Sequence, residues 1–236
     1  EDDCIPINSF FTFCEDLLER YKNDENIMQI NGYNGGFDFT DKIYCGDIKS
    51  RNKISESYFF SKLNHTWGWA TWKRAWKNFD KNFEKYQKYK KHSKILNYYI
   101  DHKISNWMIK YFDKSVSKED KIWSSNWSYS ILKKDGLCIT PKLNLISNIG
   151  FDGSGTSGKS KIFAQYSNLD ELQSNSNTEK FNNLNEMTHP EKINYDISLD
   201  QIIFYEKIKK IDPRASDNLN LSNKIKELKS KIRKFF

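Results

Sequence analysis

Residues 9–31 read SFFTFCEDLLERYKNDENIMQIN, and this stretch decides the class of fold. Its first part places apolar side chains at intervals of three and four, which predicts an amphipathic helix from Ser9 to Asn23 with Ser9 as its N-cap. The helical positions are Phe10, Phe13, Cys14, Leu17, Leu18 and Tyr21. The short apolar run at 27–30 then predicts a buried strand, followed by a Gly-rich turn. A helix followed by a buried strand favours an α/β layer structure.

The remainder of the chain supports this class. Short strands are predicted at 58–61 and 137–141, and a further extended piece at 143–150. Helices are predicted in the second half of 67–76, over 81–112 as hairpins, over 123–134 with Asp135-Gly136 as the stop, and over 198–210. Residues 37–52 are expected to form an irregular loop or hairpin. The Gly-, Ser- and Asn-rich residues 152–185 predict a long surface loop.

Composition indicates a globular protein with an excess of positive charge. The 236 residues are 15% aromatic and 29% charged, and the net charge is +7. A basic balance fits nucleic acid, phosphate ligands or an anionic membrane surface. The abundance of Lys, Asn and Ile also fits an AT-rich coding bias, and we prefer that explanation.

Several classes of protein are disfavoured by what the sequence lacks. The four cysteines form no CxxC pair and have no His at metal spacing, so zinc-finger and thioredoxin-like functions are not expected. Reduced cysteines in a cytoplasmic protein fit best. No apolar run approaches the roughly 18 residues of a membrane span. The tail at 222–236 predicts a basic amphipathic helix that either binds anionic lipid at the inner membrane or packs on the domain.

Three segments together resemble one family of enzymes. They are Glu1-Asp2-Asp3-Cys4 with the helix after it, Trp67-Gly68-Trp69-Ala70-Thr71-Trp72, and Gly136-Leu137-Cys138-Ile139 leading to Asn148-Ile149-Gly150-Phe151. In order and spacing they resemble bacterial family-2-type glycosyltransferases of surface-polysaccharide synthesis, and more distantly N-acetylglucosaminyltransferase I. The resemblance covers about residues 1–155.

The resemblance implies a GT-A, Rossmann-like sandwich that uses a nucleotide-diphosphate sugar and a Mn or Mg ion. Residues 1–155 would be the C-terminal, acceptor-binding part of the catalytic domain, 156–215 a polar and helical extension, and 216–236 the tail helix. The half that carries most of the nucleotide site is expected upstream of Glu1. The acceptor would be a glycan or a lipid-linked sugar.

Functional residues carried over from the family are those of its acidic DXD-like motif. The resemblance assigns the metal to Asp3, the donor sugar to Glu1 and the ribose to Asp2. A hard carboxylate ligand suits Mg²⁺ or Mn²⁺, and the ion offsets the charge of a leaving diphosphate. An acidic triplet is also common on solvated surfaces, and that alternative stays open.

The Trp-rich segments predict the acceptor site. Trp67 and Trp69 flank Gly68 before a helix, which suits a wall where a sugar ring stacks on aromatic faces. Trp72 and Trp76, by contrast, fit an ordinary packed helix face. Trp123 and Asn126 are expected to contribute to the same acceptor site. His65 just upstream is interpreted as an ordinary histidine.

The sequence departs from the resembled family at the position of the general base. In the resembled enzymes an Asp often follows the equivalent of Trp123, and here that position is Ser124. An inverting transfer needs a base within hydrogen-bond reach of the acceptor hydroxyl. Asp120 is the candidate that remains nearby, although acids in a lysine-rich turn are usually only solvated. Two rival hypotheses are a non-catalytic glycan-binding fragment and a basic nucleic-acid-binding protein, of which we expect the latter not to apply.

Overall fold

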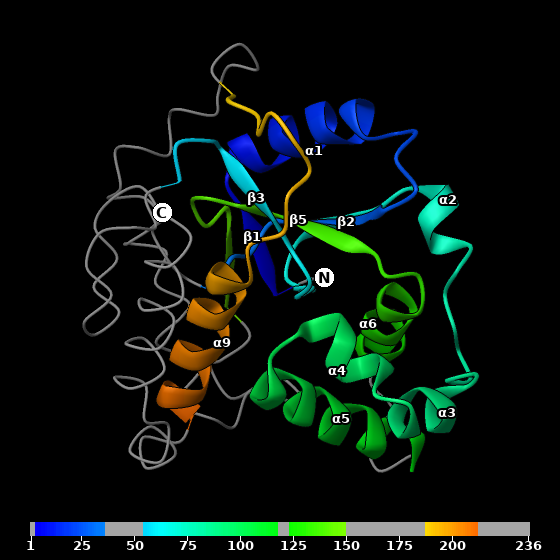
Figure 1. Ribbon diagram of the computed structural model, residues 1–236. Helices are drawn as coiled ribbons and strands as arrows, with labels where there is room; N and C mark the ends of the chain where they lie inside the picture. The colour runs from blue at the N-terminus through cyan, green and yellow to red at the C-terminus, as the bar shows by residue number, and fades with distance from the viewer. Residues whose placement is uncertain (1–2, 36–53, 118–122, 150–186, 212–236) are drawn as a thin grey trace, which may run out of the picture.

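A mixed sheet of four strands lies at the centre of the computed structural model, which describes residues 3–35, 54–117, 123–149 and 187–211 (Figure 1). Its strands are β2 (Ile27–Asn31), β3 (Tyr58–Ser61), β4 (Trp69–Ala70) and β5 (Leu137–Pro141), in the order β3-β5-β2-β4. The pair β2 and β5 is parallel, and the other two pairs are antiparallel. The predicted α/β class is therefore confirmed as a mixed α/β fold.

A second, two-stranded sheet joins the start of the described chain to its middle. Strand β1 (Cys4–Pro6) pairs antiparallel with β6 (Ile146–Asn148). The Gly32 N–H donates to the Gly68 carbonyl at 2.7 Å, so the end of β2 meets the segment before β4. Gly68 has φ +53°, and a Cβ there would lie 2.2 Å from Cδ1 of Ile146. Only glycine fits both the left-handed backbone and this close approach.

Seven helices of the described chain surround the sheets. They are α1 (Asn8–Arg20), α2 (Lys73–Trp76), α3 (Tyr86–Lys91), α4 (Lys94–Tyr99), α5 (His102–Val116), α6 (Trp123–Lys133) and α9 (Ile197–Ile211). In Figure 1, α1 lies at one end of the main sheet, α3 to α6 gather at the opposite end, and α9 lies beside β3. The helices predicted from the sequence are confirmed at these places.

One helix cap and one strand differ from the prediction. Helix α1 begins at Asn8 with extended Ile7 as its N-cap, so Ser9 is a buried residue of the first turn and not the cap. Strand β4 takes up residues 69 and 70, which the sequence does not predict as a strand, and helix α2 follows within the predicted second half of 67–76. At the end of α6, Asp135 adopts a left-handed conformation before Gly136, as the predicted stop requires.

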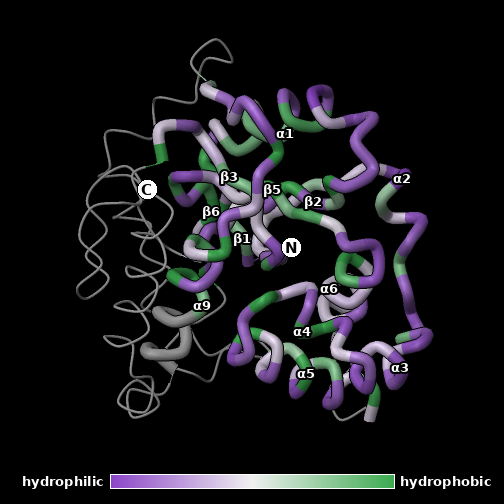
Figure 2. Tube along the Cα trace, in the orientation of Figure 1, coloured by the Kyte–Doolittle hydropathy of each residue, from purple (hydrophilic) through white to green (hydrophobic). Residues whose placement is uncertain are grey.

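The core is continuous across the main sheet and its helices. All residues of β2 and β3 are buried, and β5 is buried from Cys138 onward. Figure 2 shows hydrophobic segments along β2 and β5, with hydrophilic segments on the outer turns of α3. Phe13 and Leu17 of α1 and Trp127 of α6 are fully buried within the same core. Strands that are covered on both faces tend to have mostly apolar sequences, and most residues of β2 and β5 are apolar.

The predictions on cysteines, membrane spans and loops can be compared with the structure only where it describes the residues concerned. Cys4, Cys14 and Cys138 are free thiols, in line with reduced cysteines. Among the described helices, none combines the length and apolar character needed to cross a bilayer. The predicted loops at 37–52 and 152–185 and the tail helix at 222–236 lie outside the described residues.

Candidate functional site

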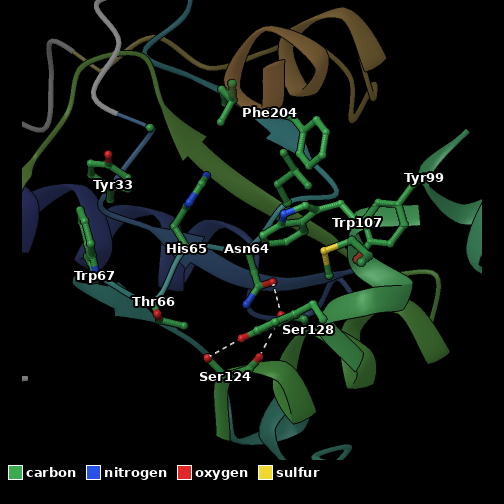
Figure 3. Close-up of a pocket in the computed structure, with 15 residues that line it drawn as sticks. Tyr33, Asn64, His65, Thr66, Trp67, Tyr99, Trp107, Ser124, Ser128 and Phe204 are labelled. Carbon is green, nitrogen blue, oxygen red and sulfur yellow. Dashed lines mark hydrogen bonds between the residues drawn. The ribbon is translucent and has the colours of Figure 1, made fainter. Parts of the chain in front are cut away.

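A cavity of about 190 Å³ opens between the end of β2, the segment after β3, and helices α5, α6 and α9 (Figure 3). Its lining is unusually rich in aromatic and hydroxyl groups. The lining residues are Tyr33, Gly35, Leu63, Asn64, His65, Thr66, Trp67, Tyr99, Trp107, Met108, Tyr111, Ser124, Ser128, Ile203 and Phe204. The cavity is thus assembled from residues that are far apart in the sequence.

Two buried amides of β2 fix the segment that forms the cavity wall. Gln29 donates to the carbonyl of His65 at 2.6 Å, and Asn31 accepts from the His65 N–H at 3.0 Å. Asn31 also donates to the Leu63 carbonyl at 3.2 Å, and the Trp127 indole N–H donates to Gln29 at 2.6 Å. Both amides are fully buried, where polar groups are stable only when hydrogen-bonded. The network therefore holds the backbone of residues 63–65 in one position.

The floor of the cavity is polar. The hydroxyls of Tyr111 and Ser124 lie 2.9 Å apart, and the Ser128 hydroxyl donates to Asn64 Oδ1 at 2.7 Å. An amide whose oxygen accepts one bond still has two N–H protons to donate, and each hydroxyl can serve as donor or acceptor. Figure 3 shows Asn64, Thr66, Ser124 and Ser128 together on this side. This side can therefore bind a ligand rich in hydroxyl groups.

Aromatic rings form the other walls. The Tyr33 and Trp67 ring centres are 4.6 Å apart, and the His65 ring meets Tyr33 edge-on at 5.5 Å. On the opposite side Trp107 meets Phe204 edge-on, with ring centres 5.8 Å apart. Burial raises the pKa of Tyr99 well above its ordinary value, so its hydroxyl stays neutral. The rings offer apolar faces with polar groups at their edges.

Helix α9 closes the cavity through Ile203 and Phe204 and is tied to the body by polar contacts. Asp200 is fully buried and accepts from the Ser61 hydroxyl at 2.5 Å and from the Lys62 N–H at 2.9 Å. Gln201 donates to Asp101 at 2.7 Å. Burial raises the pKa of Asp200 to about 6, against the opposing effect of these hydrogen bonds. The cavity wall contributed by α9 is thus anchored through a buried, hydrogen-bonded carboxyl group.

A second cavity, of about 240 Å³, lies between β1, β6 and the Trp67–Trp69 segment. Its lining includes Cys4, Gly68 and Trp69, and it shares Thr66 with the first cavity. Asp3 stands directly before Cys4, and its carboxylate accepts from the Asn148 amide at 3.2 Å. Asp3 is therefore the sequence neighbour of a residue that lines the second cavity, and the second cavity borders the first.

The residues around Asp3 fit a metal only in part. Mg²⁺ is commonly held by one or two carboxylates together with water and substrate phosphates, and Asp3 is a hard oxygen donor at a strand end. Within the described part of the chain, no three His, Cys, Asp or Glu side chains gather in a way that could hold an ion. Among the described residues, Asp3 could thus serve as one ligand of such an ion but does not form a complete site with its neighbours.

The structure brings together three of the predicted acceptor residues. Trp67 lines the first cavity, and Gly68 and Trp69 line the second. Trp123 is 41% exposed, and its ring stacks on Trp69 with centres 5.7 Å apart. Trp69 also lies against Trp76 and Trp127. Trp69 and Trp123 are therefore part of an aromatic cluster at the rim and are not lining residues of the first cavity.

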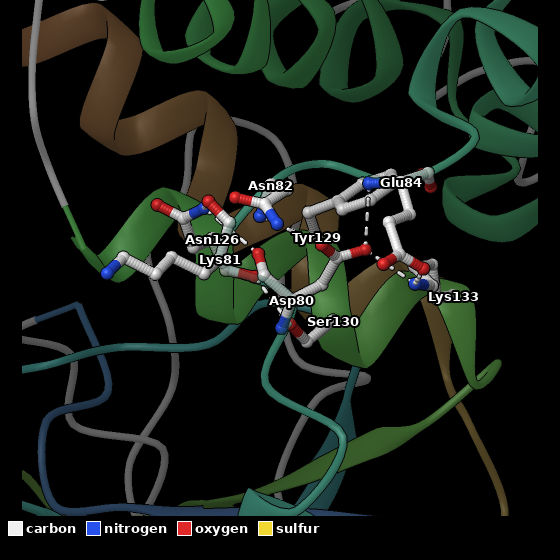
Figure 4. A network of polar contacts seen from close by, with 8 residues as sticks. All are labelled: Asp80, Lys81, Asn82, Glu84, Asn126, Tyr129, Ser130 and Lys133. Atoms are coloured by element: carbon white, nitrogen blue, oxygen red, sulfur yellow. Dashed lines mark hydrogen bonds and ion pairs between the residues drawn. The ribbon is translucent and has the colours of Figure 1, made fainter.

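Asn126 has a different environment from the one predicted (Figure 4). Its amide donates to the carbonyls of Asp80 and Lys81, both at 2.9 Å. The Asp80 carboxylate accepts from Lys133 and from the Glu84 N–H. Burial opposes ionisation of Asp80, but these hydrogen bonds hold its pKa below the ordinary value. Asn126 belongs to this loop anchor and lines neither cavity.

The remaining predicted residues are divided between the cavity and the undescribed segments. Ser124, which occupies the place of the expected base, lines the first cavity. Glu1, Asp2 and Asp120 lie outside the described residues. Sequence reasoning missed Tyr33, Trp107, Tyr111 and Phe204 and took His65 for an ordinary histidine. The available signal was the pair Gln29 and Asn31, two amides within an otherwise apolar strand.

Comparison of the chain with known protein families, with curated proteins and with solved structures finds no significant match.

Proposed function

We propose that this protein is a metal-dependent GT-A-type glycosyltransferase that moves a sugar from a nucleotide-diphosphate sugar to a glycan or lipid-linked acceptor in bacterial surface-polysaccharide synthesis. In this proposal the first cavity binds the acceptor sugar. Sugar rings have apolar C–H faces and hydroxyl edges. Trp67 and Trp107 offer rings for the faces, and Asn64, Ser124 and Ser128 offer polar atoms for the hydroxyls.

The observation that carries the proposal is that Thr66 lines both cavities. The first cavity has the chemistry of a sugar site, and the second reaches Cys4, the residue after Asp3. Donor and acceptor must lie side by side for transfer, so neighbouring cavities suit a two-substrate reaction. A Mn or Mg ion bound with the diphosphate would stabilise the negative charge of the leaving group. Asp3 would hold that ion, with Glu1 toward the donor sugar and Asp2 toward the ribose.

Mutation of Asp3 tests the proposal. The assay measures release of nucleoside diphosphate from each of a panel of nucleotide sugars. We expect the full-length protein to release it from at least one of them, and only when Mn²⁺ or Mg²⁺ is present. Because outer-shell changes already cost roughly 10–100-fold, loss of a metal ligand in Asp3→Ala should reduce turnover at least about 100-fold. Glu15→Gln is the control, since Glu15 is an exposed acid of α1. Unchanged activity in Asp3→Ala would reject the metal role.

A second candidate function is glycan binding without catalysis. It is favoured by the described lining of the first cavity, which contains no Asp or Glu, and by Ser124 in the place expected for the base. If catalysis occurs, the base is either Asp120 or His65, whose ring faces the cavity in Figure 3. Glycan binding with no turnover of any nucleotide sugar, in a protein that binds the metal normally, would favour the second candidate.

A further inference from the structure

The two ends of the first cavity differ in chemistry, which restricts the sugar it can hold. Figure 3 shows Phe204, Trp107 and Tyr99 on one side and Thr66, Ser124 and Ser128 on the other. Two more apolar lining residues come from the same helices as the first group, Ile203 from α9 and Met108 from α5. One end is therefore hydrophobic and the other hydroxyl-rich.

The hydrophobic end is well fixed. Phe204 and Met108 are each at most 4% exposed, and Ile203 is 1% exposed. The Trp107 and Phe204 rings are in edge-on contact, and α9 is tied down next to them by Gln201 and Asp101. A hydroxyl group placed against Phe204, Met108 and Ile203 would lose water, and none of these three side chains is a strong hydrogen-bond donor or acceptor, which makes that position unfavourable for it. A methyl group would gain from burial.

The size of the cavity limits the ligand to a single ring. Its volume is about 190 Å³. Clefts that hold drug-sized ligands have about 300–1,000 Å³. We propose that the cavity binds one pyranose ring that carries a methyl-terminated substituent, either an acetamido group or the methyl of a 6-deoxy sugar. The inference rests on the proposed function, because it specifies the class of sugar that the acceptor carries. The substituent lies against Phe204, Met108 and Ile203, and the ring hydroxyls lie against Asn64, Ser124 and Ser128.

Ligand-observed and protein-observed NMR with three methyl glycosides test the inference. The probes are those of N-acetylglucosamine, fucose and glucose. We expect the acetamido sugar, the 6-deoxy sugar or both to bind at least about fourfold more tightly than glucose, the effect of burying one methyl-sized group. The preferred sugar should shift the Trp107 indole signal. The comparison between the first two probes decides which substituent the cavity takes.

A near-isosteric pair of variants localises the preference. Phe204→Tyr adds a hydroxyl at the hydrophobic end. The methyl-bearing sugar and glucose should then bind this variant about equally tightly. Phe11→Tyr makes the same chemical change on the exposed face of α1, where Phe11 is 60% exposed, and should leave the preference unchanged. Ile203→Thr replaces Phe204→Tyr if the latter does not give a native thermal unfolding transition.

Three results would overturn the inference. They are equal binding of all three sugars, a preference that survives in the folded cavity variant, and ligand shifts at Trp123 with none at Trp107. The outcome is separable from that of the proposed function. A protein that selects the methyl-bearing sugar but transfers nothing would refute the enzyme and leave the inference standing. Transfer to glucose-terminated acceptors at the same efficiency would do the reverse.

Discussion

Gly68 is the residue at which three segments of the chain meet. Its carbonyl accepts from Gly32, and its Cα faces Ile146 of β6. We expect Gly68→Ala to lower the free energy of unfolding by roughly 2–4 kcal/mol, because the left-handed backbone and the overpacking against Ile146 both add to the cost. Urea unfolding followed by tryptophan fluorescence measures the change.

A double-mutant cycle separates these two causes. Ile146→Ala removes the atoms that a Cβ at position 68 would meet at 2.2 and 2.5 Å. Gly68→Ala should therefore be less destabilising in the Ile146→Ala background, by the overpacking share of about 1–3 kcal/mol. Equal effects in both backgrounds would show that packing against Ile146 does not restrict position 68.

Single residues of the site were only partly predictable. The alternation of Trp around Gly68 predicts a wall of an acceptor site, whereas its close contacts with Ile146 and Gly32 depend on the tertiary fold and were not predictable from the alternation. His65 gave no signal of its own, because its position depends on a hydrogen bond that its carbonyl accepts from Gln29 and one that its N–H donates to Asn31, both more than 30 residues earlier in the chain. Asn126 looked like a ligand-binding amide, but its partners Asp80 and Lys81 are set by tertiary structure.

At the scale of elements, the attachment of α9 should depend on pH through Asp200. Its pKa is raised from an ordinary 3.8 to about 6, mainly by burial. A raised acid pKa contributes stability that is complete below pH 3.8 and is lost as the pH rises through about 6. That difference corresponds to about 3 kcal/mol. The stability of the wild type relative to Asp200→Asn should therefore fall by about this amount between pH 4 and pH 7.

The amide variant is a suitable comparison because it can keep both contacts. Its oxygen can accept from the Lys62 N–H, and its NH₂ can donate to the Ser61 hydroxyl. Other groups facing Asp200 are Lys62, Tyr195 and Tyr99, of which Lys62 has its pKa lowered mainly by burial. Asp135→Asn, at an exposed left-handed position, is the control and should track the wild type. A parallel pH profile for Asp200→Asn would contradict the assignment.

Elements with a strong local pattern were predictable from sequence. Helix α1 and strand β2 follow directly from the apolar spacing in residues 9–31, and Asp135-Gly136 stops α6 where the sequence predicts. Strand β4 was missed, because its two residues, Trp69 and Ala70, are too few to show an alternating pattern. Its existence depends on pairing with Ile30 and Asn31 of β2.

For the whole molecule, the positive charge raises the question of nucleic acid. Base stacking on proteins needs exposed aromatic faces. Here Trp76 packs on Phe79 and Trp127, and Trp123 stacks on Trp69, so part of each ring is already in contact with another ring, although Trp76 and Trp123 remain 42% and 41% exposed. We expect only non-specific binding of single strands, with a dissociation constant of about 10⁻⁴–10⁻⁶ M at physiological salt.

Filter binding at two salt concentrations measures this. The control is a sulfated or otherwise anionic polymer without bases, which should bind about as well if charge alone is responsible. Nanomolar binding of single-stranded nucleic acid that the anionic polymer does not match would favour the nucleic-acid hypothesis over the glycosyltransferase.

The mixed α/β class could be read from the sequence, but the cavity could not. Its walls come from the end of β2, from the segment after β3, from α5 and α6, and from α9. None of these segments is distinctive alone, since Tyr33 looks like a turn residue and Phe204 like an ordinary core position. Only the packing of α9 beside α5, through Phe204 and Trp107, brings the last wall into place.

The position of α9 in the chain has a consequence for biogenesis. Residues 27–148 contain every strand of the main sheet, whereas Ile203 and Phe204 emerge from the ribosome more than fifty residues later. A nascent chain exposed as far as β6 contains every strand of the main sheet, but the first cavity still lacks the wall that α9 provides. The wall that closes the first cavity is therefore translated only after the strands that orient its other walls.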